Sequence, residues 1–572
     1  MTRIKILHLL AAAAIAISAI AAESKPAFGL RILNHWDNLD GTIERGYAGR
    51  SLWKWDELPD SLSPRYEEYA RLCSSVGING TVLNNVNASA RILSGEYLAK
   101  VAALADVFRP YGLKVYLSVN FASPMLLDSL PSADPLDTAV VGWWSRKVDE
   151  IYRLIPDFGG FLVKANSEGQ PGPCDFGRTH AEGANMLARQ LARHRGIVMW
   201  RAFVYSPGDA DRAKQAYMEF QPLDGKFDDN VIVQIKNGPI DFQPREPFSP
   251  LLTAMPHTAT MPELQITQEY LGHSNHLAYL GTMWEEFFRL VDPSTQKGVA
   301  GVANIGDAPN FTAHPFARAN LYAFGRLACD PTLSAEEIAR DWVRLELRPA
   351  TEATTDSIVD MMMASREAVV DYMMPMGLHH LFAYGHHYGP EPWCDVEGAR
   401  PDWLPSFYHR ADSVGLGFDR SPSGSNATAQ YPEPYASQYA SIETCPEEYL
   451  LWFHHVPWTY RMPDGSTMWE TLCRHYETGC RRAEAMKETW RRCEPDIADK
   501  ELHADVLARL TTQARDARWW AEACMLYFQQ FHAMPLPDFV ARPKHTLEQL
   551  KQICLPIDNF TCPSPEMLDS LR

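Results

Sequence analysis

The segment GFLVKAN (residues 160–166) is a short apolar run that ends in a lysine and an asparagine and is followed by the polar loop SEGQ. Short apolar runs bounded by polar segments are typical of buried strands. Several such runs alternate along the chain with amphipathic helical stretches, which is typical of parallel β/α folds. The predicted strands are Leu30–Trp36, Gly80–Asn85, Lys114–Asn120, Gly160–Asn166, Ile197–Phe203, Val231–Asn237, Leu264–Glu269 and Gly301–Gly306.

Eight strands of this kind predict an α/β fold of the closed (β/α)₈ TIM barrel type, which we place at residues 23–345. A doubly wound open sheet is the alternative. It is disfavoured because no glycine-rich phosphate loop follows the first strand and the sequence contains no P-loop motif. Helices are predicted between the strands, for example at Pro64–Val76, Glu96–Tyr111, Asp137–Leu154 and Arg178–Arg195.

The strand signal fades after about residue 346. Residues 351–374 and 466–531 have helical patterns, and the stretch between them is rich in Trp, His, Tyr, Gly and Pro. We therefore expect residues 346–572 to form a mainly α-helical C-terminal domain whose loops close over the mouth of the barrel.

The first 22 residues have the pattern of a signal peptide. Arg3 and Lys5 form a basic start, Ile6–Ala22 is apolar, and Ala19-Ile20-Ala21 is a small-residue cleavage pattern. The apolar run is short for a membrane span, and no later segment is long and apolar enough to cross a bilayer. We expect an exported protein, periplasmic or secreted, with no membrane partner.

The net charge of −18 argues against nucleic acid and anionic membranes as partners. Metal is not expected, because the eleven cysteines show no CxxC spacing and the histidine pairs show no HExxH spacing. We name no disulfide and no cofactor. The histidine pairs are His379/His380, His386/His387 and His454/His455.

Charged residues gather where four successive predicted strands end, and a TIM barrel places its active site at these ends. Glycoside hydrolysis needs a proton donor and a second carboxylate, and converging cations suit a substrate carboxylate. The alternative, an ion-pair network that only seals the barrel, is disfavoured because burying six charges without a ligand is costly. The cations are Lys164, Arg201 and Lys236, and the carboxylates are Glu168, Asp241 and Glu269. The site is expected to be locally positive within an acidic protein.

Five segments resemble the α-glucuronidases of glycoside hydrolase family 67, and the resemblance covers about residues 29–560. The segments are RILNHWDN (31–38), GFLVKANSEGQPGP (160–173), QIKNGPIDFQPRE (234–246), LQITQEY (264–270) and HHLFAYGHHYGPEPW (379–393). The resemblance implies an inverting hydrolase that releases α-1,2-linked glucuronic acid, or its 4-O-methyl ether, from glucuronoxylan-derived xylo-oligosaccharides.

The resemblance also implies roles for individual residues. Glu168 takes the place of the general acid, and Asp241 and Glu269 match the pair that positions and deprotonates a water. Lys164, Arg201 and Lys236 match uronate-binding positions, and Trp36 matches a tryptophan that packs on the sugar. Apart from the resemblance, Trp393 and Trp403 are candidates for stacking on sugar, with burial in the core as the alternative.

Three expectations stay open at this point. The barrel is predicted to begin just after the signal peptide, without the N-terminal domain usual in the family, which leaves polymer binding in doubt. A homodimer through the C-terminal domain is implied by analogy alone. The rival functions are a retaining glycosidase acting on another uronic-acid glycoside and a non-catalytic barrel that binds acidic oligosaccharides.

Lys164 lies four residues before Glu168, and its charge would lower the pKa of that carboxyl, which is unsuitable for an acid. Burial acts in the opposite direction. We hypothesise that the carboxylate of the substrate cancels the cations, so that Glu168 is protonated when a uronate is bound.

Overall fold

The computed structural model describes residues 26–203, 210–558, 563 and 568. The predicted signal peptide at residues 1–22 lies outside the described residues. In the part of the chain that is described, no helix has both the length and the apolar character needed to cross a membrane.

Eight parallel strands form a closed barrel in which β8 pairs with β1, so the TIM barrel prediction is confirmed and the open sheet is excluded. Each strand is buried almost throughout because helices cover its outer side, which explains the continuous apolar runs in the sequence. The strands are β1 Leu30–Asn34, β2 Gly80–Val82, β3 Lys114–Ser118, β4 Gly160–Val163, β5 Ile197–Arg201, β6 Val231–Lys236, β7 Thr260–Gln265 and β8 Gly298–Val302.

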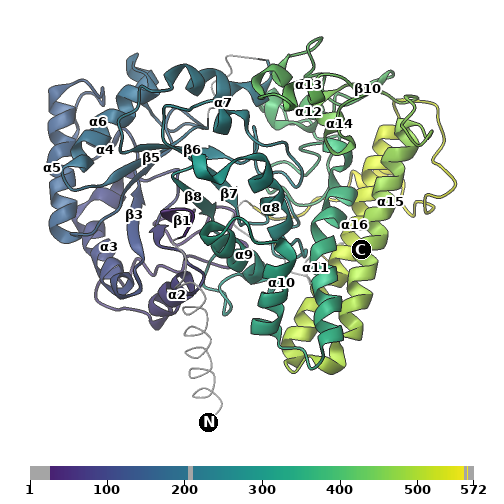
Figure 1. Cartoon of the computed structure of the whole chain (residues 1–572), viewed down its shortest axis with the longest axis horizontal. Coiled ribbons are helices and arrows are strands. Elements are labelled where there is room, and N and C mark those ends of the chain that lie inside the picture. Colours follow the sequence, from purple (N-terminus) through teal and green to yellow (C-terminus); the bar gives the residue numbers. More distant parts are fainter. Residues whose placement is uncertain (1–25, 204–209, 559–562, 564–567, 569–572) are drawn as a thin grey trace.

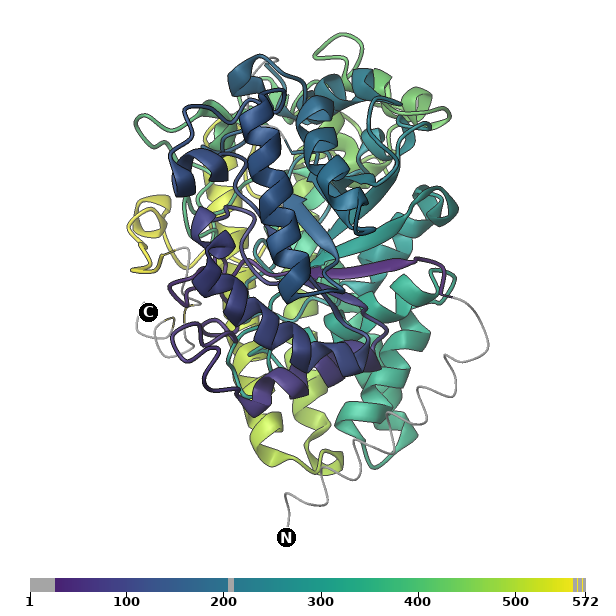
Figure 2. The same ribbon diagram turned by 90° about the vertical axis from the view of Figure 1, so that its left-hand side faces the viewer.

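The helices that follow the strands surround the barrel (Figures 1 and 2). Side-chain caps mark where several of them start. For example, Thr179 and Glu182 form a capping box at the start of α6, and Asp137 accepts from the backbone N–H of Ala139 at the start of α5. The helices are α2 Pro64–Ser75, α3 Gly95–Phe108, α4 Ser123–Asp128, α5 Thr138–Leu154, α6 His180–Ala192, α7 Arg212–Phe220, α8 Gly281–Leu290 and α9 Ala317–Cys329.

Two strands lie earlier in the chain than predicted. Strand β7 is Thr260–Gln265 instead of Leu264–Glu269, and β8 is Gly298–Val302 instead of Gly301–Gly306. The start of β7 carries Pro262 and a charged residue, and both argue against a central strand when local preference is considered alone. Glu269 therefore lies in the loop after β7 and not on the strand.

A bundle of long helices forms most of the C-terminal region and packs beside the barrel (Figure 1). The helical stretch predicted at 466–531 is two helices, interrupted by a 3₁₀ turn at Glu494–Asp496 that contains a proline. The long helices are α11 Glu352–Met373, α15 Met468–Arg492 and α16 Lys500–Gln529, and the short α10 Ala335–Trp342 packs between α9 and α11.

Between α11 and α15 the chain forms short elements and long loops. These are α12 Pro405–His409, β9 Gly415–Leu416, α13 Tyr435–Tyr439, α14 Leu450–Phe453 and β10 Val456–Pro457, and the short α17 Leu547–Leu550 follows α16. Residues between 380 and 405 reach the barrel mouth and line its cavity. The ten cysteines among the described residues are free thiols.

Candidate active site

A cavity of about 290 Å³ lies at the carboxyl ends of the barrel strands. The structure brings seven of the eight predicted site residues to its wall: Trp36, Lys164, Glu168, Arg201, Lys236, Asp241 and Glu269. The remaining wall comes from the loops after β1, β2, β5 and β7, from the start of α7, and from the segment that runs from α11 to the start of α12. The cavity is therefore shared between the barrel and the C-terminal region.

Glu168 lies in the loop after β4 and has a left-handed backbone (φ 48°), which is unfavourable for a residue other than glycine. Its carboxylate forms an ion pair with Lys164, whose Nζ also donates to Asn87 Oδ1 at 2.8 Å. The Glu168 side chain is 34% exposed. Burial raises the pKa of Glu168, but the charges of Lys164 and Lys236 outweigh it and leave the pKa below the usual value.

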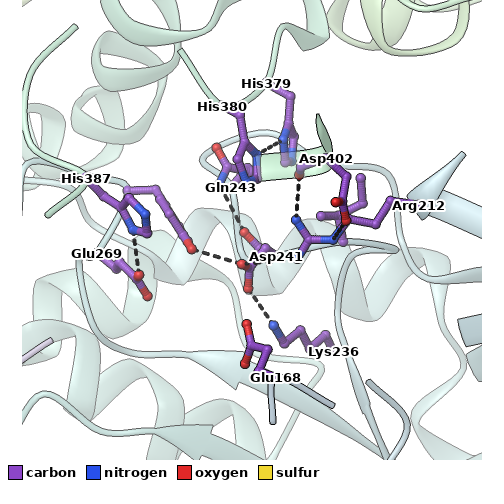
Figure 3. A network of polar contacts seen from close by, with 12 residues as sticks. Glu168, Arg212, Lys236, Asp241, Gln243, Glu269, His379, His380, His387 and Asp402 are labelled. Atoms are coloured by element: carbon purple, nitrogen blue, oxygen red, sulfur yellow. Dashed lines mark hydrogen bonds and ion pairs between the residues drawn. The ribbon is translucent and has the colours of Figure 1, made fainter. Parts of the chain in front are cut away.

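Asp241 lies in the loop after β6 and is surrounded by donors (Figure 3). Lys236 Nζ is 2.5 Å from Oδ1, the Tyr270 hydroxyl donates to Oδ2 at 2.9 Å, and Arg212 Nη2 lies 3.8 Å from Oδ2. Burial raises the pKa of Asp241, but Lys236 and Arg212 together hold it well below its usual range. Asp241 is therefore an ionised carboxylate fixed in one orientation.

The Asp241 loop is folded around a buried carboxylate, that of Glu246. This carboxylate accepts hydrogen bonds from the backbone N–H groups of Ile240 (2.7 Å), Asp241 (3.1 Å) and Gln243 (3.1 Å). A Cβ at Gly238 would lie 2.3 Å from Glu246 Cδ, so only glycine allows the carboxylate to come this close. Burial raises the pKa of Glu246 to about 7, against the effect of the backbone donors.

Glu269 is held mainly through one of its two oxygens. Arg45 Nε lies 2.6 Å from Oε1 and His387 Nδ1 lies 2.9 Å from the same atom. Gln265 Nε2 is 3.4 Å from Oε2. Arg45 belongs to the loop after β1, where it also donates to the backbone carbonyl of Gly385 at 2.7 Å. The position of Glu269 thus depends on two segments far from it in the sequence.

Arg201, a predicted uronate ligand, forms a bidentate pair with Glu263 of β7 at 2.7 and 2.6 Å. Gln234 Nε2 donates to Glu263 at 2.5 Å, and all three side chains are buried. The shift of β7 brings Glu263 into the barrel interior, so sequence analysis missed this partner. Arg201 reaches the cavity wall with Nε and Nη2 already engaged.

The expectation of a locally positive site is corrected by these pairs. The cavity is lined by five cations, which are Arg45, Lys164, Arg201, Arg212 and Lys236, and by four carboxylates, which are Glu44, Glu168, Asp241 and Glu269. Glu263, which forms an ion pair with Arg201, is a fifth carboxylate. The empty site is balanced when Glu168 is ionised, and it gains one positive charge when Glu168 is protonated.

Trp393 is the predicted site residue that the structure places elsewhere. Its ring packs against Tyr527 of α16, with ring centroids 6.2 Å apart, and Lys551 Nζ lies 5.9 Å from the ring. Trp36 and Trp403 both line the cavity. Phe203 lines it as well, with its ring centroid 3.3 Å from Lys236 Nζ. A loop tryptophan cannot be assigned to a site from sequence spacing, because its loop has no periodic direction.

Within the described residues, Cys174, His180 and Glu219 form a group close enough to hold a metal ion. Trp200 Nε1 donates to His180 Nδ1 at 3.2 Å, so the hydrogen of the neutral imidazole is on Nε2. That nitrogen lies 2.6 Å from Glu219 and donates to its carboxylate. The histidine offers no free lone pair at the centre of the group, so these residues form a hydrogen-bonded chain that does not suit a metal.

Several residues that contact the predicted carboxylates and cations were not predicted from the sequence, among them Arg45, Arg212, Glu263, Tyr270 and His387. Tyr270 and His387 lie inside the segments LQITQEY and HHLFAYGHHYGPEPW, so those motifs held a usable signal. Arg45 and Arg212 lie outside every segment that carried the resemblance, and only the folded chain brings them to the cavity.

Comparison with known proteins shows the family to which the chain is related. Residues 10–325 match the model described as the glycosyl hydrolase family 67 middle domain, and residues 312–540 match the model of the family 67 C-terminus. The chain is 42% identical to the "Probable alpha-glucuronidase A" of Neosartorya fischeri, over 90% of this chain and 63% of that protein. It is 41% identical to the "Alpha-glucuronidase A" of Emericella nidulans, over 92% of this chain and 65% of that protein.

The chain therefore spans just under two thirds of the length of these relatives. Among solved structures, one described as a GH138 enzyme targeting pectin rhamnogalacturonan II covers 89% of this chain and 59% of its own, with a TM-score of 0.50 and 11% identity. At this identity the likeness concerns the fold alone. The two family models confirm the resemblance that the five sequence segments indicated.

Proposed function

The chain belongs to glycosyl hydrolase family 67, and from this premise we propose that it is an α-glucuronidase acting on glucuronoxylan-derived oligosaccharides. The bond that it cuts is the α-1,2 link to glucuronic acid or its 4-O-methyl ether. The observation that carries the proposal is the set of three carboxylates around one cavity, each paired with a cation.

In the proposed reaction Glu168 is the general acid. Its proton goes to the glycosidic oxygen as the bond from that oxygen to C1 breaks. A water bonds to C1 from the opposite face of the ring, and its proton goes to the pair formed by Asp241 and Glu269. This arrangement gives inversion, for which the acid and base of glycosidases are roughly 6.5–9.5 Å apart.

The cations suit a sugar that carries one negative charge. Lys164, Arg201 and Lys236 come from the ends of β4, β5 and β6, and Arg212 lies beside them on the cavity wall. A uronate carboxylate could take charge-assisted hydrogen bonds from several of these groups. The cavity volume of about 290 Å³ is at the small end of ligand sites, which suits one uronosyl ring with the xylose chain outside.

Charge balance links protonation of the acid to the presence of the substrate. Lys164 pairs with Glu168 in the empty site and holds its pKa below the value that a general acid needs. When a uronate takes over Lys164, Glu168 loses its nearest cation, and this loss favours the protonated form. The uronate then replaces the charge that the proton removes from Glu168.

The test is incubation with aldouronic acids of defined length, followed by product analysis. We expect free glucuronic acid from the wild type and none above background from Glu168→Ala. Proton NMR on fresh hydrolysate should show the β-anomer first. Early α-anomer would point to a retaining glycosidase, and tight binding without release would point to a binding protein.

We further propose that the protein is exported, as the predicted signal peptide indicates, and that it dimerises through its helical region. Cell fractionation tests the first statement and sedimentation velocity tests the second. A protein retained in the cytoplasm, or a single species of monomer mass at micromolar concentration, would contradict them.

A further inference from the structure

Two carboxylates share the general-base role in the proposed reaction, but their surroundings differ in a way that separates them. We propose that Arg45 and His387 act as a clamp that makes Glu269 the proton acceptor, while Asp241 stays ionised and orients the water. This inference rests on the proposed hydrolysis and assigns positioning roles to two residues that were not among the predicted site residues.

A carboxylate accepts a proton at an oxygen that has a free lone pair. Each oxygen has two such positions, so the donors already present decide which oxygen is available. Glu269 Oε1 forms an ion pair with Arg45 Nε at 2.6 Å and accepts a hydrogen bond from His387 Nδ1 at 2.9 Å, so this oxygen already faces a cation and a donor. Among the described residues the only hydrogen bond to Oε2 comes from Gln265 Nε2 at 3.4 Å, and that amide also donates to Thr267. Oε2 is thus the oxygen open to a proton.

Asp241 has donors on both oxygens. Oδ1 receives Lys236 at 2.5 Å, and Oδ2 receives Tyr270 at 2.9 Å with Arg212 at 3.8 Å. Protonation of Asp241 would weaken ion pairs with two enclosed cations, Lys236 and Arg212, whereas protonation of Glu269 would weaken its pair with one, Arg45, so the proton costs more on Asp241. Asp241 can therefore accept a hydrogen bond from the water without taking its proton.

His387 acts as a donor without adding charge. A carboxylate only accepts, so the hydrogen of the imidazole is on Nδ1. Burial and the nearby Arg45 lower the pKa of His387, which keeps the ring neutral. Of the two clamp residues, only Arg45 therefore carries a positive charge. The other charged groups that line the cavity are Glu44, Lys164, Glu168, Arg201, Arg212, Lys236 and Asp241.

The clamp is anchored by the C-terminal region. Arg45 also donates to the Gly385 carbonyl, and this hydrogen bond links the loop after β1 to the segment that carries His387. The next residue after His387, Tyr388, donates through its hydroxyl to the buried Asp516 of α16. A Cβ at Gly389 would lie 2.3 Å from the ring of Trp519, so this segment packs closely on α16. Helix α16 thus fixes His387 against Glu269.

The proposed hydrolysis consumes one water and conserves the protons of the two carboxyl groups. The oxygen of water forms the bond to C1, one of its protons goes to Glu269 Oε2, and the proton of Glu168 leaves with the xylosyl oxygen. Exchange with solvent then returns a proton to Glu168 and removes one from Glu269, so no other reactant is needed.

The first experiment uses azide, an anionic nucleophile that needs no base. We expect azide to restore turnover of Glu269→Ala at least tenfold, with a β-glucuronosyl azide as product, and to leave Asp241→Ala unchanged. Rescue of Asp241→Ala, alone or together with Glu269→Ala, would overturn the assignment. If azide rescues neither variant, the pH profiles of the Asn and Gln variants decide.

The acidic limb of kcat/KM reports the base of the free enzyme. We expect Asp241→Asn to keep this limb at reduced height and Glu269→Gln to lose it, and the reverse result would overturn the assignment. His387→Ala should lower kcat about ten- to a hundredfold and move the limb to higher pH, because one donor to the charged carboxylate is lost. An unmoved limb in His387→Ala would refute the clamp.

Controls separate this inference from the function itself. His455→Ala removes a partly exposed imidazole that pairs with Asp412 outside the cavity and should leave the profile unchanged. Thermal melting of each variant checks that it folds. A wild type that releases no glucuronic acid would remove the proposed function, whereas an active wild type with rescue at Asp241 removes only the assignment of the base.

Discussion

Two strands of the barrel carry the same arrangement, a lysine at the strand end and a carboxylate a few residues later, but they use it differently. Lys164 precedes Glu168 after β4, and Lys236 precedes Asp241 after β6. The Glu168 side chain is 34% exposed, whereas that of Asp241 is 15% exposed with Tyr270 as a further donor. One pair can open when a substrate arrives, while the other is fixed by its surroundings.

The difference shows that a local motif does not define a chemical role. A carboxylate with one cationic partner at a cavity wall can exchange that partner for a proton. A carboxylate that is enclosed by several donors remains ionised. On this comparison Glu168 is suited to donate a proton, and Asp241 is suited to hold a charge and an orientation.

The largest effect is expected for Glu168→Gln on natural oligosaccharides, where kcat should fall about 10²- to 10⁴-fold because the xylosyl oxygen leaves unprotonated. A 4-nitrophenyl glucuronide needs no such proton, so its turnover should fall far less. Asp241→Asn should impair both substrates. Steady-state kinetics on the two substrates measures this, and equal losses for Glu168→Gln on both would contradict the role of Glu168.

The two lysines should differ in their effect on stability. Lys236→Met leaves the enclosed carboxylate of Asp241 short of its nearest cation and should cost about 3–5 kcal/mol of unfolding free energy. Lys164→Met frees a partly exposed carboxylate and should cost at most about 1 kcal/mol, while raising KM. Urea unfolding of both variants gives the comparison. Similar losses of stability in the two variants would show that the pairs are equivalent.

The fixed Asp241 loop should also show in the pH dependence of stability. The pKa of Glu246 is about 7 in the folded state, above its usual value of 4.5, so the folded state binds more protons between these values. Glu246 therefore contributes to the unfolding free energy at low pH. This contribution decreases by at most about 3 kcal/mol as the pH rises from about 4.5 to 7.

Glu246→Gln removes this titration. The unfolding free energy of the wild type, measured relative to the variant, should therefore decline across that range of pH. Chemical unfolding at pH 4.5, 6 and 8 tests this. A difference between the two proteins that stays constant with pH would argue against a titrating Glu246.

The smallest effect concerns coupling between substrate and acid. On an α-glucosyl analogue of the same oligosaccharide, no carboxylate competes for Lys164, and Glu168 stays paired and ionised. Each pKa unit costs about tenfold in the protonated fraction, so kcat should fall at least about tenfold in addition to any change in KM. Equal kcat values on the glucosyl and glucuronosyl substrates would reject the coupling.

The sequence alone determined much of this protein. The alternation of apolar runs and amphipathic stretches was enough for the barrel, because strand and helix periods are properties of consecutive residues. Polar strand ends and five motifs were enough to bring Lys164, Glu168, Lys236 and Asp241 together. These pairs are close in the chain, so their meeting at one rim follows once the barrel is known.

The tertiary structure alone decided the partners that come from distant segments. His387 lies 118 residues from Glu269, and Arg45 reaches Glu269 from the first loop of the barrel. Glu263 belongs to the site because β7 starts earlier than local preference indicates. Trp393 lies outside the site, which could not be predicted because its loop has no periodicity that would indicate its direction. Periodicity and spacing describe neighbours in the chain, whereas these contacts depend on barrel closure and on the packing of α16 behind the catalytic loops.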